Sequence, residues 1–95
     1  MDKNLSRIRG KILPILRKNG VSRAGIFGSH ARGRPKKGSD IDLLVEFRGH
    51  KSLFDLVGLK LDLEEQTKRK FDVLTYGSIN YLLKDQILKE EVRIL

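Results

Sequence analysis

Hydrophobic residues recur at helical spacing near the beginning of the chain. They lie three or four positions apart and share one face, which predicts a helix over residues 5–19. Asn4 or Ser6 is expected to cap its start, and the Asn-Gly pair at 19–20 to end it. Pro14 predicts a kink or a split, because proline has no amide hydrogen to donate within a helix. The repeating positions are Leu5, Ile8, Ile12 and Leu16.

Short apolar runs bounded by turn residues predict strands in the rest of the chain. Three of them cover residues 21–27, 41–47 and 71–75, and the tail at 92–95 is a candidate for a short extra strand. The second run is continuously apolar at 43–45, which indicates a strand covered on both faces.

Two further helices are predicted over residues 52–67 and 79–88. Ser52, with Asp55 three positions later, matches the pattern of an N-terminal helix cap. The first of the two helices has a broad apolar face that includes Leu53, Phe54, Leu56, Val57 and Leu61, and the second carries Ile79, Leu83 and Ile87 on one face.

The length and composition limit the class of protein. Ninety-five residues without a repeat or a long linker predict a single domain over 1–95. There is no cysteine, which excludes disulfides and thiolate metal sites. No run approaches the roughly 20 apolar residues that span a membrane, and the first residues lack the apolar stretch of a signal peptide. A cytoplasmic location without a membrane partner is therefore expected.

The positive charge is concentrated in one half of the chain. Residues 1–39 hold eleven Lys and Arg and one acid, whereas residues 40–95 hold nine Lys and Arg and eleven acids. This asymmetry points to an anionic partner, although a solvated surface explains the charge alone equally well. Phe27 is the lone aromatic residue of the basic half, so stacking on bases is not indicated and nucleic acid is not expected as a direct partner.

The segment from Gly28 to Asp42 carries the chemistry. Gly28 allows a backbone to approach a phosphate closely, and Ser29 adds a hydroxyl donor. Asp40 and Asp42 are two positions apart, so in a strand both carboxylates point to one face. Paired carboxylates repel and favour a cation between them, and Mg²⁺ takes oxygen ligands while keeping room for phosphate. Two such ions stabilise both oxygens of an in-line displacement, which indicates chemistry on a nucleoside triphosphate.

The predicted topology brings a third carboxylate to the same place. If Gly28 and Asp40 belong to one site, the first strand runs toward it and the second away from it, so the two are antiparallel. A strand–helix–strand crossover is normally parallel, which puts the start of the third strand, with Asp72, near the site. Asp72 then completes the ligand set or takes a proton from the incoming hydroxyl.

Basic residues follow the Gly-Ser turn and are candidates to neutralise phosphate. Arg32 is the favoured contact, whereas Lys36 and Lys37 fit a basic loop better than fixed ligands. His30 is a candidate to line the nucleotide site. Each residue taken singly also has an ordinary structural explanation, such as a solvated strand start. Their predicted meeting at one place supports the functional interpretation.

These motifs resemble those of a known family. Gly28-Ser29, ten intervening residues and Asp40-Ile41-Asp42 match the signature of the polymerase-beta-type nucleotidyltransferase superfamily. The fuller string, Gly-Ser-x-Ala-Arg-Gly followed by Ser-Asp-Ile-Asp-Leu-Leu-Val, resembles the minimal nucleotidyltransferases (MNT) of prokaryotes, which are about this long. The resemblance covers nearly the whole chain, including the segment 71–74.

The resemblance implies a fold and an activity. The fold is a small mixed β-sheet flanked by helices, of the α/β (α+β) class, as in the nucleotidyltransferase palm. The activity is Mg²⁺-dependent transfer of AMP from ATP with release of pyrophosphate. Asp40, Asp42 and Asp72 are the implied metal ligands, and Gly28 and Ser29 hold the triphosphate. Members of this group are often antitoxins that add AMP to a tyrosine of a helical HEPN-type RNase toxin, which is the implied partner.

Two other hypotheses stay open at this stage. One is transfer to a small molecule or an RNA end, as in larger relatives of the superfamily. The other is a non-catalytic nucleotide-binding protein that acts by forming a complex with the toxin. The sequence does not specify the base of the nucleotide, the acceptor, the number of AMP units added or the oligomeric state.

Overall fold

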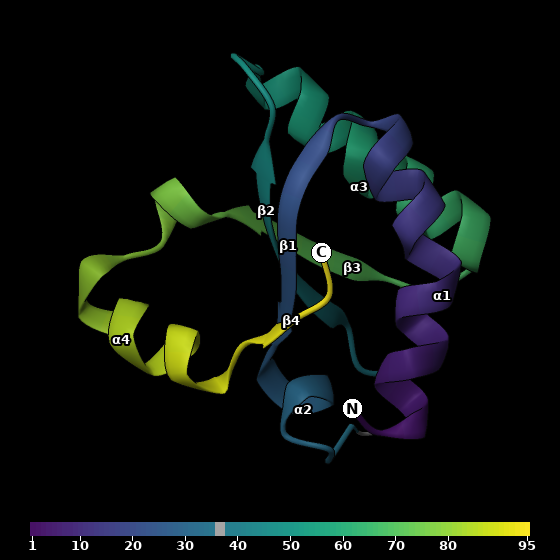
Figure 1. The fold of residues 1–95 in the computed structure, drawn as a ribbon, viewed down its shortest axis with the longest axis vertical. Helices are drawn as coiled ribbons and strands as arrows, with labels where there is room; N and C mark the ends of the chain where they lie inside the picture. Colours follow the sequence, from purple (N-terminus) through teal and green to yellow (C-terminus); the bar gives the residue numbers. More distant parts are fainter. Residues whose placement is uncertain (36–37) are drawn as a thin grey trace.

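A computed structural model of the chain describes residues 1–35 and 38–95 (Figure 1). The strands predicted at 21–27, 41–47 and 71–75 are confirmed at both ends, and the chain ends in a short fourth strand. The elements are α1 (Lys3–Lys18), β1 (Val21–Phe27), α2 (Gly28–Ala31), β2 (Ile41–Phe47), α3 (Leu53–Thr67), β3 (Phe71–Thr75), the 3-10 helix η1 (Tyr76–Ser78), α4 (Tyr81–Glu90) and β4 (Val92–Arg93).

The strands form one mixed sheet in the order β3-β2-β1-β4. β1 is antiparallel to β2 and to β4, and β2 is parallel to β3. The predicted directions of the first three strands are therefore confirmed, as is the α/β (α+β) class with a small mixed sheet flanked by helices. The long helix α3 connects the two parallel strands, as the crossover rule requires.

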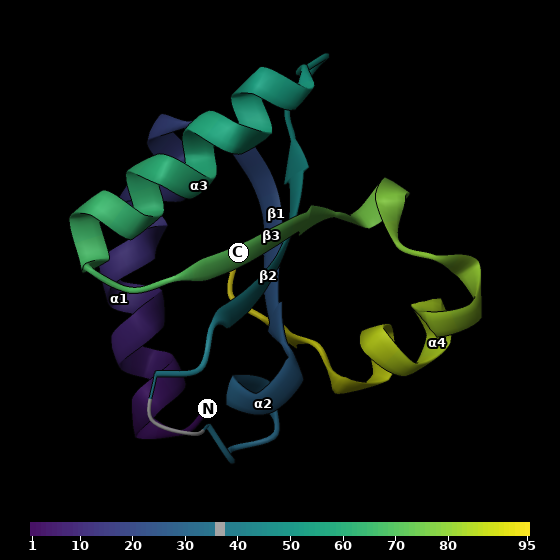
Figure 2. The same ribbon diagram turned by 180° about the vertical axis from the view of Figure 1, so that it is seen from behind.

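Helices α1 and α3 pack together over one face of the sheet, whereas α4 stands on the opposite side of the molecule (Figures 1 and 2). Alternate strand residues face α1 and α3 and form the core with them. Leu44, on the other face of β2, is also fully buried, which confirms that this strand is covered on both faces. The strand residues of the core are Val21, Ala24, Ile26, Ile41, Leu43, Val45, Phe71 and Val73.

The first helix departs from its predicted start and shape. It begins two residues earlier than expected, because Asp2 rather than Asn4 or Ser6 is its N-cap and accepts a hydrogen bond from the Leu5 amide at 2.7 Å. Pro14 lies within a helix that continues to Lys18, so the predicted split does not occur. Pro14 is exposed to solvent. The i−4 residue whose carbonyl it leaves unpaired is Gly10, which has no side chain to crowd the turn.

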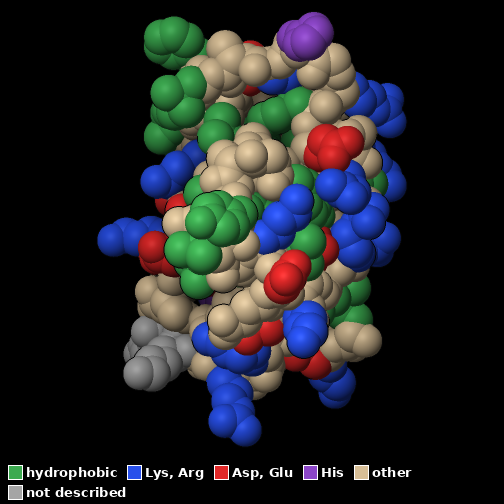
Figure 3. All heavy atoms as spheres, turned by 90° about the vertical axis from the view of Figure 1, so that its left-hand side faces the viewer, with side chains coloured by type: hydrophobic (Ala, Val, Ile, Leu, Met, Phe, Trp, Pro, Cys, Tyr) green, Lys and Arg blue, Asp and Glu red, His purple; other side chains and the backbone are tan. Residues whose placement is uncertain are grey.

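The apolar faces predicted for the two later helices are only partly buried. Ser52 and Asp55 cap α3 as predicted, with the Ser52 amide donating to the Asp55 carboxylate at 2.8 Å. Only Leu59 and Leu63 of α3 are buried, and α4 buries none of its residues. Figure 3 shows hydrophobic side chains scattered among basic ones on the side of the molecule where α4 lies. The exposed apolar residues of these helices are Leu53, Phe54, Val57, Leu61, Tyr81, Leu82, Leu83 and Leu88.

Within the described residues, no helix combines the length and the apolar character that crossing a membrane requires.

Candidate active site

Gly28 lies where β1 ends, directly against the side chain of Asp42. Its backbone has φ +72°, in the left-handed region that favours glycine. A Cβ atom added to Gly28 would overlap the Asp42 carboxylate. Phe27, the residue before it, pairs with Asp42 across the antiparallel β1–β2 ladder. The glycine that begins the turn and the second aspartate of the motif, predicted to share one site, are therefore in contact.

Asp42 and Asp72 are side by side on neighbouring parallel strands. They are register partners in the β2–β3 ladder, where adjacent strands lie about 4.8 Å apart. Asp40 precedes β2 and is exposed, as is Asp72, whereas Asp42 is half-buried. The structure thus brings Asp42 and Asp72 together at one edge of the sheet, on the face opposite the helical core. Asp40, two positions before Asp42, is close enough for its charge to act on Asp42.

Negative charges lie close together at this edge of the sheet, and they affect the ionisation of Asp42. Burial raises the pKa of the Asp42 carboxyl above its usual value, and the nearby carboxylates of Asp72 and then Asp40 raise it further. The Arg32 guanidinium lowers the same pKa, but as the smallest of the four causes. A cation at this place would relieve the repulsion that Asp42 experiences.

The donor set fits Mg²⁺, although the side chains are not arranged as a finished site. Among the described residues, no group of three or more His, Cys, Asp or Glu side chains is already placed to hold a metal ion. The three aspartates nevertheless supply hard oxygen ligands, and the charges of Asp72 and Asp40 both act on Asp42. Asp40 and Asp72 are both exposed to solvent. We therefore regard the residues as compatible with a magnesium ion.

The two predicted phosphate contacts differ in their surroundings. Ser29 is half-buried in the first turn of α2. Arg32, at the end of α2, is close enough to act on Asp42, but its Nη1 forms an ion pair with Glu90 of α4 at 3.0 Å. The structure thus places Arg32 beside the candidate site with a competing carboxylate. Lys36 and Lys37 lie outside the described residues.

His30 lies below the surface beside the candidate site. It is 1% exposed, and its Nδ1 is 3.0 Å from Asn4 Nδ2 of α1. Its Nε2 lies 3.5 Å from Ser39 Oγ. Burial lowers the pKa of His30 below its usual value, which favours the neutral ring. His30 therefore joins α1 to the segment before Asp40, rather than presenting its ring to a nucleotide.

Sequence reasoning missed the basic turn before β3. Lys68, Arg69 and Lys70 line a cavity of about 330 Å³ together with Asp40 and the preceding residues 38–39. Three consecutive cations just before the predicted third strand were the signal, because the topology had already placed the start of that strand at the site. Glu90, the partner of Arg32, gave no signal, since 58 positions separate the two residues.

The comparison with known protein families agrees with this geometry. Residues 9–94 match the family model described as "Nucleotidyltransferase domain". The chain belongs to the nucleotidyltransferase domain family, and the resemblance noted from its motifs is confirmed.

Individual relatives indicate which kinds of nucleotidyltransferase the chain resembles. The chain is 59% identical over 92 residues to "Putative protein adenylyltransferase MJ0435" of Methanocaldococcus jannaschii, covering 97% of this chain and 99% of the relative. It resembles a solved structure described as a minimal nucleotidyltransferase, with 34% identity, a TM-score of 0.80 and coverage of 97% and 95%. The fold also matches a complex described as a tri-AMPylated Shewanella oneidensis HEPN toxin with an MNT antitoxin, with 20% identity, a TM-score of 0.74 and coverage of 95% and 71%.

Proposed function

We propose that this protein is a Mg²⁺-dependent adenylyltransferase and antitoxin, which transfers AMP from ATP to a tyrosine hydroxyl of a HEPN-type RNase toxin. The observation that carries the proposal is the pairing of Asp42 with Asp72 in register, with Gly28 packed against Asp42. This arrangement combines paired carboxylates with a turn that has no side chain in the way of a phosphate. Residues 1–95 act as one domain in this proposal.

The chain's own residues have distinct parts in the proposed reaction. The glycine at position 28 and the hydroxyl of Ser29 hold the triphosphate at the end of β1. The tyrosine oxygen bonds to the α-phosphorus, and the bond from that phosphorus to the oxygen bridging to the β-phosphate breaks. Pyrophosphate leaves with that oxygen, and Asp72 accepts the proton of the hydroxyl.

Asp40, Asp42 and Asp72 are the residues that would hold magnesium. When bound, Mg²⁺ neutralises phosphate charge and stabilises the oxygens that enter and leave. The pKa of Asp42 is raised first by burial and then by the charges of Asp72 and Asp40, and a bound cation would offset both costs of the ionised carboxylate.

Arg32 is proposed to bind phosphate after its ion pair with Glu90 opens. The pair is exposed, with 52% of the Arg32 side chain accessible. Exposed pairs contribute only about 0–1 kcal/mol, so a triphosphate with several negative charges competes readily for the guanidinium.

The toxin partner is proposed from the relatives. A relative that shares 59% identity is named as a protein adenylyltransferase, and a complex with the same fold is described as an AMPylated HEPN toxin with its MNT antitoxin.

The direct test is transfer of label. The protein, Mg²⁺ and ATP labelled at the α-phosphate are incubated with a HEPN-type toxin from the same organism, and the product is mapped by mass spectrometry. The expected product is that protein with AMP on a tyrosine. Asp42→Asn and removal of Mg²⁺ by a chelator are each expected to abolish labelling.

A suitable control is Glu46→Gln, which removes a carboxylate of β2 that pairs with Arg23 away from the three aspartates. It is expected to transfer AMP at the wild-type rate. Labelling of RNA or of small hydroxyl compounds without labelling of the protein would contradict the proposed acceptor. Full neutralisation of the toxin by Asp42→Asn would contradict a catalytic mode of action.

A further inference from the structure

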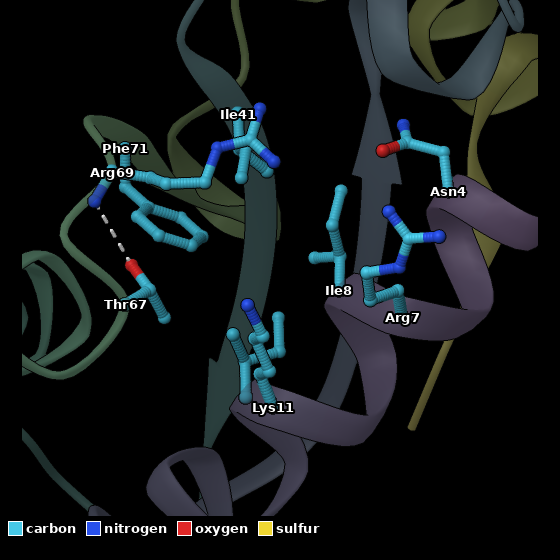
Figure 4. A pocket seen from close by; sticks show the side chains of 9 residues that line it. Asn4, Arg7, Ile8, Lys11, Ile41, Thr67, Arg69 and Phe71 are labelled. Carbon is cyan, nitrogen blue, oxygen red and sulfur yellow. Dashed lines mark hydrogen bonds between the residues drawn. The ribbon is translucent and has the colours of Figure 1, made fainter.

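A narrow pocket that no step of the proposed reaction uses opens between α1 and the beginnings of β2 and β3 (Figure 4). Its floor is formed by core side chains, each no more than 5% exposed. An apolar floor of this kind does not solvate a charged group by itself. The floor residues are Ile8, Ile12, Ile41 and Phe71.

Three cationic side chains border the pocket. Arg7 and Lys11 are four positions apart on α1 and therefore share one face of the helix. Arg69 reaches toward them from the turn before β3, on the other side of the pocket (Figure 4). In the part of the chain that the structure describes, none of the three forms an ion pair with a carboxylate. Converging positive charges without counter-charges attract an anionic group.

The size of the pocket limits what enters it. Its volume is about 40 Å³, and a buried water needs roughly 10–15 Å³ on this kind of measure. The pocket therefore admits about three heavy atoms, the size of a carboxylate group. Phe71 is 1% exposed and offers no ring face on which a base could stack.

The pocket is continuous with the candidate active site through Arg69. This residue also lines the larger cavity that contains Asp40, together with Lys68 and Lys70. A chain segment held at the pocket thus continues along a basic surface to the carboxylate edge.

We propose that this pocket and the adjoining turn 68–70 dock an acidic segment of the protein acceptor. One Asp or Glu side chain of that segment is seated between Arg7, Lys11 and Arg69, and further acidic residues follow the turn toward Asp40. The proposal rests on the proposed function in that the acceptor is a protein. Docking at this place supplies the acceptor specificity that the catalytic carboxylates do not.

The test compares two variants with the same loss of charge. Arg7→Gln with Lys11→Gln removes two cations from the pocket. Arg17→Gln with Lys18→Gln removes two from the last turn of the same helix, away from it. All four residues are exposed, and glutamine is as good a helix former as arginine or lysine. Circular dichroism is expected to show both variants folded.

Binding is measured first, by calorimetry with the HEPN-type partner in the absence of ATP and with a chelator. The pocket variant is expected to bind roughly tenfold or more weakly than wild type, since desolvated charge pairs dominate such losses. The Arg17, Lys18 variant is expected to bind as wild type does. Equal dissociation constants for the two variants would overturn the inference.

A second experiment measures the binding of a single-stranded RNA oligonucleotide of about ten nucleotides, as an alternative anionic ligand, to the two variants. Weak RNA binding that both variants share is expected. RNA binding lost only in the pocket variant, with partner binding unchanged, would reassign the pocket to nucleic acid and overturn the inference.

Transfer kinetics separate this inference from the proposed function. With ATP and Mg²⁺ present, the pocket variant is expected to raise the KM for the protein acceptor about tenfold while kcat and the KM for ATP stay unchanged. Absence of transfer in every variant, with the binding difference intact, would reject the proposed function and leave the docking site. Wild-type KM values in the pocket variant would reject the docking site alone.

Discussion

The contact between Gly28 and Asp42 predicts that adding a single methyl group at position 28 disturbs the candidate site. Gly28→Ala adds a Cβ at φ +72°, where it overlaps the Asp42 carboxylate. Strained left-handed backbone costs about 1–3 kcal/mol for a residue other than glycine, and the displaced carboxylate disturbs the candidate site. We expect a lower free energy of unfolding, measured in urea, and loss of AMP transfer.

Gly49→Ala is the matched control for this prediction. Gly49 has φ +68°, and a Cβ atom added to it would meet no heavy atom within 4 Å, so its substitution carries similar backbone strain without the overlap. It is expected to lower stability by a comparable amount and to keep transfer activity. Equal activity of the two variants would show that the close approach at Gly28 has no role in the site.

The charged Asp42 carboxylate is expected to lower the free energy of unfolding. Its pKa is raised above 3.8 in the folded protein, mainly by burial and then by Asp72. The folded state therefore binds a proton more tightly than the unfolded state, and this contribution is lost as pH rises through the raised pKa. Asp42→Asn keeps the shape without the charge, so at pH 7 it should raise the free energy of unfolding by roughly 0.5–2 kcal/mol.

Urea unfolding of wild type and Asp42→Asn across pH 4 to 7 checks this sign. The difference between them is expected to shrink as pH falls toward 3.8, because the wild-type carboxyl becomes neutral. In a second measurement, Mg²⁺ is expected to raise the Tm of wild type and not that of the variant. A variant less stable than wild type at pH 7 would contradict the crowding of charge at this position.

The residues that sequence reasoning brought together are those connected by topology. The adjacency of Asp42 and Asp72 followed from strand direction alone, and the register confirms that adjacency. The roles of the three aspartates stay predictions, because no metal or nucleotide tests them. The ion pair between Arg32 and Glu90 could not be predicted from the sequence, since it depends on how α4 lies beside α2.

At the scale of elements, α1 tolerates a proline that ought to break it. Pro14 leaves one carbonyl unpaired in a helix that extends from Lys3 to Lys18. Proline costs about 3 kcal/mol relative to alanine inside a helix, and the stiffer unfolded chain offsets about 0.4–1 kcal/mol. Pro14→Ala is therefore expected to raise the free energy of unfolding by about 2 kcal/mol, measured by urea denaturation.

Pro35 provides the comparison, because it is exposed and lies in no helix or strand. Pro35→Ala is expected to leave stability unchanged or slightly lower, through the unfolded state alone. A similar increase in the free energy of unfolding from both substitutions would mean that Pro14 does not destabilise the helix.

The helical patterns located α3 and α4 but not their surroundings. Spacing of apolar residues shows that a helix has one apolar face, and it does not specify what covers that face. For α1 the cover is the sheet, whereas most of the apolar residues of α4 remain exposed. The bounds of the strands were predicted more accurately, because short runs of β-branched residues and leucine between turn residues fit few structures other than a strand.

At the scale of the whole molecule, packing is concentrated on one side of the sheet. The core joins α1, α3 and the three longer strands, while the opposite face carries the aspartates and is bordered by α4. α4 is attached near its end, where Glu90 pairs with Arg32 and the Tyr76 hydroxyl donates to the Glu91 carboxylate. A helix of ten residues with no buried side chain gains little from packing and is marginal by itself.

Hydrogen exchange followed by NMR tests this distribution of stability. Amides of β1, β2 and the inner face of α1 are expected to exchange only through global unfolding, whereas those of α4 should exchange through local opening at much lower free energy. Arg32→Gln removes the ion pair to Glu90 and should speed exchange in α4 while leaving the strands unchanged. Protection of α4 equal to that of the sheet would contradict the assignment of stability to one side.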